Sequence, residues 1–231
     1  MKAYSLLELS IVVVIMALLM AGISSGQAIL KKAKLHGAIT ELKEIEASII
    51  LFKEQYSYYP GDFNNAYYYF GEDKICGTES ECNGDGDDII EIGSKNNSEV
   101  YRSFQHLNLA GLIKQQFNGV WGESHSVMQA STGGNYTIIY DYQLENIIKL
   151  GKEISISGET SDGGILLPKD AEIIDKKIDD GFPNKGDVRG MMGFYGGSST
   201  NLENYNKNCL SESMYNVTFE DNKACAIGLK I

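Results

Sequence analysis

The chain has 231 residues, of which 43% are hydrophobic and 22% charged, and its formal net charge is −11. Nucleic-acid surfaces need clustered lysine and arginine, so this acidity argues against nucleic acid as a partner. The sequence also lacks the His-Glu-x-x-His and P-loop motifs of common enzymes. We therefore expect a protein that is not an enzyme.

The first predicted element is a membrane helix. Residues Leu9 to Leu30 form a run of 22 residues without a charge. At about 1.5 Å per residue, this run is roughly 33 Å long and crosses a hydrocarbon core of about 30 Å. Glu8 lies at the edge of the run, and a carboxylate near membrane depth is costly unless it has a partner or a function. The alternative is an acid that simply flanks the membrane.

The residues around Glu8 carry a resemblance to a known family. Ala3-Tyr4-Ser5-Leu6-Leu7-Glu8-Leu9 resembles the processing site of type IV prepilins and type II secretion pseudopilins. The resemblance implies that prepilin peptidase cuts after Ala3 and methylates the new N-terminus at Tyr4. Glu8 then takes the acidic position of the family.

A fibre of such subunits gives Glu8 a physical role. Apolar helices that pack side by side must bury the polar groups they carry. The amino group of Tyr4 and the Glu8 carboxylate of a neighbour would neutralise each other there and fix the axial stagger. The resemblance implies that the partners are further copies, other pilin-like subunits, prepilin peptidase and the inner-membrane assembly machinery. It also implies a single pass through the bacterial inner membrane, a periplasmic head, and a pilus or pseudopilus after assembly.

The second half of the predicted helix is amphipathic. Apolar residues recur in steps of three and four and form one narrow seam, which comprises Leu35, Ala38, Leu42, Ile45, Ile49, Phe52 and Tyr56. We expect one continuous helix over residues 5–56, with weak points at Gly22, Gly26 and Gly37. The seam is expected to dock on the protein's own sheet, and a coiled-coil stalk is the alternative.

These features predict a fold and its division. The fold class is α+β, with a long N-terminal helix packed on an antiparallel sheet, like that of type IV pilins. The expected parts are a leader at 1–3, a transmembrane and assembly half at 4–30, an amphipathic half at 31–57, and a periplasmic globular head at 58–231.

A long acidic loop follows the helix, from Gly71 to Asn97. Its oxygen-bearing side chains Asp85, Asp87 and Asp88 stand near one another, as at the start of a Ca2+ loop. The EF-hand pattern then fails, because Asp88 stands where glycine is needed and Ser94 where glutamate is needed. The two hypotheses are a Ca2+ loop of another kind and a solvated turn. We expect no other cofactor.

The four cysteines fall into two near pairs. Three pairings are open to four cysteines, and loop closure favours the two local ones, Cys76 with Cys82 and Cys209 with Cys225. Neither pair has the spacing of a metal site. Two disulfides indicate a head outside the cytoplasm. Cys209 and Cys225 also resemble the disulfide-closed terminal loop of type IV pilins.

The lysines beside the apolar run predict the opposite orientation of the chain in the membrane. Lys31, Lys32 and Lys34 follow the run, whereas Lys2 precedes it. Charge bias alone would place the three lysines, and with them the head, in the cytoplasm. The cysteines and the leader favour the opposite orientation, and the conflict stays open at this stage.

Shorter elements are predicted in the rest of the chain. Helices are expected at 98–110, capped by Ser98, and from Pro168 to Gly181. Strands are expected at 136–142, 153–157, 164–167, 191–195, 215–219 and 224–229. Segments 59–63, 104–113 and 174–183 are similar to parts of other pilin-like proteins that carry the prepilin leader.

The leading hypothesis is a structural subunit of a type IV pilus or a type II secretion pseudopilus. A first alternative is a membrane-anchored binding protein or adhesin that uses the tyrosines near residue 60 and the acidic loop. A second is a tethered hydrolase that uses Asp179 or Asp180. His106 and His125 have no neighbouring nucleophile or ligand cluster in sequence, so both are expected to be structural.

Overall fold

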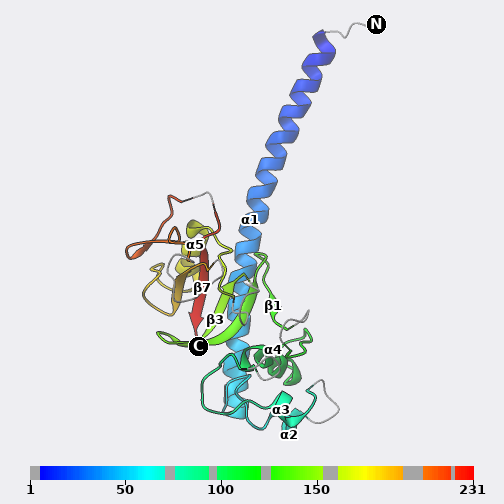
Figure 1. The fold of residues 1–231 in the computed structure, drawn as a ribbon. Coiled ribbons are helices and arrows are strands. Elements are labelled where there is room, and N and C mark those ends of the chain that lie inside the picture. Colours follow the sequence, from blue (N-terminus) through cyan, green and yellow to red (C-terminus); the bar gives the residue numbers. More distant parts are fainter. Residues whose placement is uncertain are drawn as a thin grey trace.

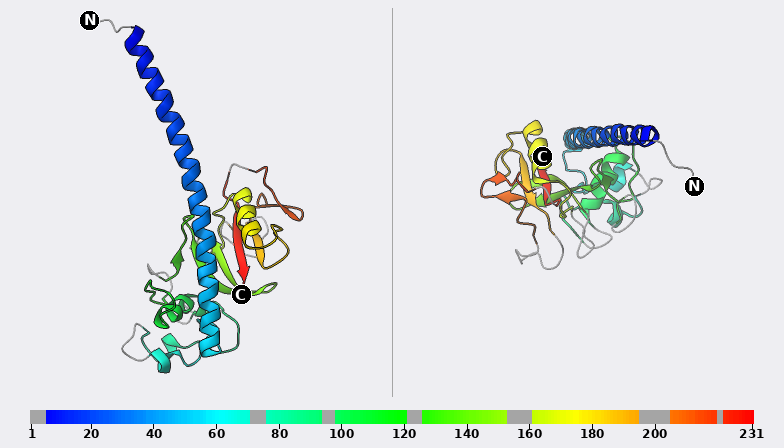
Figure 2. Two further views of the ribbon diagram at one scale, coloured as in Figure 1. Left: turned by 180° about the vertical axis from the view of Figure 1, so that it is seen from behind. Right: turned by 90° about the horizontal axis from the view of Figure 1, so that it is seen from above.

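The molecule is organised along one helix, α1 (Leu6–Tyr56), which has 51 residues. The computed structural model describes residues 6–70, 76–93, 98–120, 126–152, 161–194, 205–219 and 222–231. The N-terminal half of α1 projects from the head as a single rod, and its second half runs along the head (Figure 1). The left view of Figure 2 shows the same separation from behind. The helix passes through Gly22, Gly26 and Gly37 without a break, so the predicted weak points do not interrupt it.

The head contains an antiparallel sheet of five strands in the order β1-β2-β3-β7-β4. These strands are β1 (Met128–Gln129), β2 (Asn135–Asp141), β3 (Glu145–Gly151), β4 (Val188–Met192) and β7 (Cys225–Lys230). A separate two-stranded hairpin is formed by β5 (Leu210–Ser211) and β6 (Met214–Tyr215). The long apolar helix and the antiparallel sheet confirm the α+β class.

Within the described residues, four short helices surround this framework. They are α2 (Ala66–Phe70), α3 (Glu79–Cys82), α4 (Glu99–Leu109) and α5 (Pro168–Ile178). Helices α2, α3 and α4 gather at the end of α1 that lies far from its N-terminus, and α5 lies nearer the projecting half (Figure 1).

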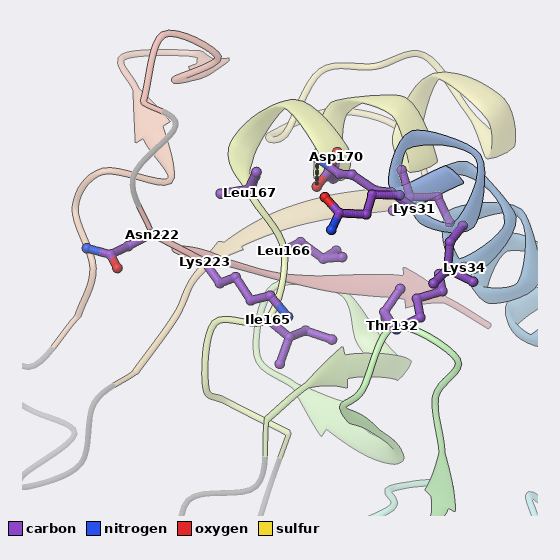
Figure 3. A pocket seen from close by; sticks show the side chains of 12 residues that line it. Lys31, Lys34, Thr132, Ile165, Leu166, Leu167, Asp170, Asn222 and Lys223 are labelled. Carbon is purple, nitrogen blue, oxygen red and sulfur yellow. Dashed lines mark ion pairs between the residues drawn. The ribbon is translucent and has the colours of Figure 1, made fainter. Parts of the chain in front are cut away.

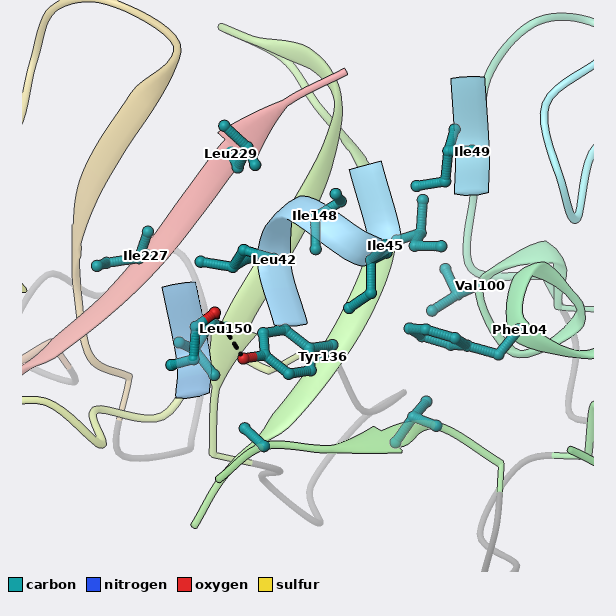
Figure 4. Close-up of a cluster of buried hydrophobic side chains, with 14 of the residues drawn as sticks. Leu42, Ile45, Ile49, Val100, Phe104, Tyr136, Ile148, Leu150, Ile227 and Leu229 are labelled. Carbon is teal, nitrogen blue, oxygen red and sulfur yellow. Dashed lines mark hydrogen bonds between the residues drawn. The ribbon is translucent and has the colours of Figure 1, made fainter. Parts of the chain in front are cut away.

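The core forms where the seam of α1 meets the sheet. Leu42, Ile45 and Ile49 are at most 1% exposed and point toward side chains of β2, β3, β7 and α4 (Figure 4). The strand side comprises Tyr136, Ile148, Leu150, Ile227 and Leu229, and α4 adds Val100 and Phe104. Alternate residues of a strand share one face, which explains the spacing of the strand residues. Docking of the seam on the protein's own sheet is thereby confirmed.

Strand β3 was missed in the sequence because its turn carries no glycine. Asp141 pairs with Glu145 across a hairpin whose loop is residues 142–144. Glu145 closes the loop with a φ of 67°, a left-handed conformation that glycine more often supplies. Glycine and proline are the usual signals of a turn in a sequence, and they do not mark this hairpin.

Several other expectations need correction. Residues 164–167 form no strand, although Leu166 makes an isolated bridge to Cys225. The hydroxyl of Ser98 caps nothing, although α4 starts beside it, at Glu99. Strand β4 begins and ends three residues earlier than predicted, and β6 has only two residues, so 216–219 form no strand. The expected strand at 153–157 lies outside the described residues. Gly111, with a φ of 75°, follows α4 as expected.

Candidate functional site

The first candidate site is the projecting half of α1. By length and composition, α1 could cross a membrane, and its most apolar window has no buried residue. Leu6 is 87% exposed and Leu19 61%, so a continuous apolar surface faces outward along this half. An exposed apolar patch of this extent marks a surface that contacts membrane or other protein.

Glu8 stands in the first turn of this helix. A carboxylate there is stabilised by the partial positive charge of the helix N-terminus. The predicted processing residues Ala3 and Tyr4 lie outside the described residues, so the proposed pairing with Glu8 stays a prediction.

Polar contacts hold the second half of α1 at a fixed position against the head. The hydroxyl of Tyr136 on β2 donates to Glu41 Oε2 at 2.8 Å, and the amide of Ser131 donates to the same oxygen at 3.1 Å. The Ser131 hydroxyl donates to the Lys34 carbonyl at 3.0 Å. A Cβ on Gly37 would lie 2.6 Å from this hydroxyl, so the glycine serves close approach rather than bending.

A buried histidine ties the far end of the head together. His106 Nδ1 accepts from the Gly61 amide at 2.9 Å, so its Nε2 carries the proton and donates to the Cys82 carbonyl at 2.8 Å. Burial lowers the pKa of His106 to about 4, which keeps the ring neutral. His106 is therefore structural, as predicted, and His125 lies outside the described residues.

Gly61 offers a stability test of this junction. Its φ is 95°, and a Cβ would lie 2.3 Å from the Glu99 carbonyl oxygen. We expect Gly61→Ala to lower the free energy of unfolding by about 2–4 kcal/mol, from backbone strain and overpacking together. Gly111→Ala is the matched control, because Gly111 has a φ of 75° but nothing within 4 Å of a Cβ. Equal losses in thermal or urea unfolding would contradict the close contact.

The acidic loop wraps around a carboxylate that the sequence did not indicate. Asp62 is fully buried, and its Oδ1 accepts from the amides of Gly86 at 2.6 Å and Asp87 at 3.1 Å. Its Oδ2 accepts from the Asp88 amide at 2.9 Å. Asp62 was missed because it lies more than 20 residues from the loop in sequence.

Three acids of this region could hold a cation. Carboxylate oxygens of Asp62, Asp85 and Asp87 lie within 4.8 Å of one another, whereas the predicted ligand Asp88 is not in the group. Asp88 has a φ of 69°, so it adopts the conformation for which the EF-hand pattern uses glycine. The oxygens suit Ca2+. The same carboxylates also organise the loop through backbone amides, and Ca2+ binding stays a hypothesis.

The two roles differ in one measurement. A Ca2+ site predicts a melting temperature that rises with added Ca2+ and falls with a chelator, and Asp85→Asn should reduce this response. An unchanged melting temperature would reject the Ca2+ site, and the carboxylates would then serve only to organise the loop.

Glu99 gives the same region a pH dependence. Burial raises the pKa of Glu99 to about 7 from its ordinary 4.5, although the amides of Asp85 and Glu91 donate to it and lower the pKa in part. Asp62 and Asp85 lie near Glu99 and raise the pKa further. The folded state thus binds a proton between pH 4.5 and 7 that the unfolded state has released. The contribution of Glu99 to stability is full below pH 4.5 and is lost as the pH rises through 7.

We expect Glu99→Gln to remove part of this loss, so its unfolding free energy should fall less than that of the wild type between pH 5 and 8. Asp62, whose pKa burial raises to about 6, acts in the same direction, and His106 acts in the opposite one. Glu54→Gln, at an exposed position of α1, is the control and should keep the wild-type slope. Urea unfolding at a series of pH values measures the slopes, and identical slopes in Glu99→Gln and the wild type would contradict the assignment.

The second acidic group lies at the end of α5. Asp175 is buried and accepts from the Tyr215 hydroxyl at 2.8 Å and the Gly181 amide at 2.9 Å. Asp179 accepts from the Asp187 amide at 2.6 Å, and Asp180 from the Phe182 amide at 2.8 Å. The carboxylate oxygens lie within 4.8 Å of one another. Each acid thus organises the turns that follow α5.

The cysteines are joined in the two local pairs. Cys76 bonds to Cys82, and Cys209 bonds to Cys225 across a sequence separation of 16. The second bond ties the segment before hairpin β5–β6 to strand β7.

Comparisons with known proteins identify no relative. No protein-family model, no curated protein and no solved structure matches this chain.

Proposed function

We propose that this chain is a structural subunit of a type IV pilus or a type II secretion pseudopilus, processed by prepilin peptidase and assembled through its N-terminal helix. The observation that carries the proposal is the division of α1. One continuous helix has an entirely exposed apolar half and a second half whose seam is buried against an antiparallel sheet. The prepilin-like residues Ala3 to Leu9 add the proposed cut after Ala3 and the acid at Glu8.

This architecture serves both states of such a subunit. Before assembly, the apolar half stays in the inner membrane and the disulfide-bonded head lies in the periplasm. In the fibre, the same half packs against its neighbours, and this packing keeps its apolar surface out of water once the helix has left the membrane, at about 25 cal/mol per Å2. The contacts from Glu41 to Tyr136 and Ser131 keep the helix fixed to the head, so force along the helix reaches the head directly.

Site-specific photo-crosslinking in the host tests the helix packing. A photo-crosslinking residue in place of Val13, which is 58% exposed, should capture a second copy or another pilin-like subunit. The same position in a Glu8→Ala background is the control, and these crosslinks should disappear there. Adducts to lipid alone, in both backgrounds, would favour a static anchor, the arrangement of a membrane-anchored binding protein.

A further inference from the structure

A cavity of about 560 Å3 lies where the projecting half of α1 joins the head (Figure 3). One wall is α1 around Lys31 and Lys34, and another is the segment Ile165–Leu167 that leads into α5. Lys223, just before β7, completes it from a third direction. The volume lies in the range of sites for small molecules, about 300–1,000 Å3.

The cavity combines an apolar floor with a basic rim. Leu35, Ile165 and Leu166 are at most 8% exposed and form part of its lining. Three lysines and one acid are its charged lining residues in the described part of the chain, namely Lys31, Lys34, Lys223 and Asp170. The site is therefore locally positive in a chain whose formal net charge is −11.

Two of the three lysines are available to pair with a charged ligand. Lys31 Nζ pairs with Asp170 Oδ2 at 2.9 Å, and the Asp170 side chain is only 9% exposed. This pair fixes the start of α5 against α1. Lys34 and Lys223 are exposed and form no ion pair with any residue in the described ranges. Their ammonium groups are suited to a phosphate, which lysine binds as a point charge.

The position of the cavity along α1 indicates the source of that phosphate. A bilayer is about 30 Å thick in its hydrocarbon core and about 40–45 Å with its headgroups, so each headgroup layer is roughly 5–7 Å thick. At about 1.5 Å per residue, that layer spans four or five residues of a helix. The apolar run ends at Leu30, so the headgroup layer falls on residues 31–35, and these include the α1 lysines of the cavity.

We propose that this cavity binds the headgroup and glycerol backbone of an anionic phospholipid from the membrane that α1 spans. Lys34 and Lys223 bind the phosphate, and the floor around Ile165 and Leu166 takes the ester and the first methylenes. The apolar floor and the exposed Leu30 at its edge favour a lipid over a soluble phosphate ester. The bound lipid would set the head at one height and rotation on the membrane. Lipid binding would also give Lys31 and Lys34 a function on the side of the membrane where the head lies, although charge bias alone would place these lysines in the cytoplasm.

This inference rests on the proposed membrane placement of α1, but it requires neither cutting nor fibre assembly. The test is native mass spectrometry of the full chain released from nanodiscs that hold equal amounts of phosphatidylglycerol and phosphatidylcholine. We expect one retained phosphatidylglycerol, preferred over phosphatidylcholine by tenfold or more. The variant Lys34→Gln/Lys223→Gln should lose at least about tenfold of this preference, because each lysine near an anionic surface contributes about 1 kcal/mol.

The control is Lys32→Gln/Lys169→Gln, which removes two lysines near the same height that do not line the cavity. It should keep the wild-type preference. Equal retention of both lipids, or a preference that survives in Lys34→Gln/Lys223→Gln, would overturn the proposal. Glycerol phosphate that displaces the lipid at equal concentration would assign the site to a soluble ester, and a second copy of the chain retained there would assign it to subunit contact. A chain isolated from host membranes that still begins at Met1 but retains the lipid would reject the fibre proposal and leave this one standing.

Discussion

Glu8→Ala is expected to abolish fibre assembly while cutting after Ala3 continues. The carboxylate stands in the first turn of a helix whose apolar surface is exposed throughout this half. In a packed bundle, the amino group of Tyr4 on a neighbouring subunit would remain buried without its counter-charge in the variant. Breaking a buried pair by removing one partner costs about 3–5 kcal/mol. A cost of this size at every subunit interface should leave no fibres in sheared or solubilised material.

Two controls separate this effect from a general loss of the protein. Ser10→Ala changes a neighbouring polar residue whose hydroxyl donates to the Leu7 carbonyl of its own helix, and it should assemble normally. The Glu8→Ala head should melt at the wild-type temperature, because Glu8 stands in the first turn of α1, whose N-terminal half projects from the head (Figure 1). Normal fibres from Glu8→Ala would refute the role assigned to this residue.

The second large effect is expected at the C-terminal disulfide. Both sulfurs of Cys209–Cys225 are buried, and Cys225 opens strand β7, which lies between β3 and β4. For a loop of about 15 residues, the chain-entropy model gives about 3 kcal/mol of stabilisation. We therefore expect Cys209→Ala/Cys225→Ala to lower the melting temperature by roughly 6–12 °C, at about 2–4 °C per kcal/mol for a domain of this size.

The other disulfide provides the comparison. Cys76 and Cys82 have a sequence separation of only 6, so Cys76→Ala/Cys82→Ala should cost about 1 kcal/mol less. Differential scanning calorimetry of both variants, with the reduced wild type beside them, measures the two losses. A larger loss at the short loop would show that loop closure does not govern these bonds.

Local patterns predicted the elements whose signals lie within one segment. The steps of three and four from Leu35 to Phe52 predicted a helix with one buried seam, and that seam packs against β2, β3 and β7. The short spacings between cysteines favoured the pairs that are formed. The β2–β3 hairpin was not predicted, because Glu145 rather than glycine adopts the left-handed turn conformation.

Contacts between distant segments had no local signal. Asp62 accepts amide hydrogens from the loop at 86–88, and His106 joins Gly61 to Cys82. The cavity at Lys34 and Lys223 combines four parts of the chain that only the folded head brings together. A buried carboxylate or a basic cavity of this kind depends on tertiary structure, and no spacing within the sequence encodes it.

The central claim is that prepilin peptidase cuts the chain after Ala3 and that α1 then serves as the assembly helix. The most direct test is mass spectrometry of the N-terminal peptide of the protein isolated from host membranes. The account predicts a peptide that begins at Tyr4 with a methylated amino group. A peptide that begins at Met1 would contradict it, because an uncut chain can serve only as a static membrane anchor for the head.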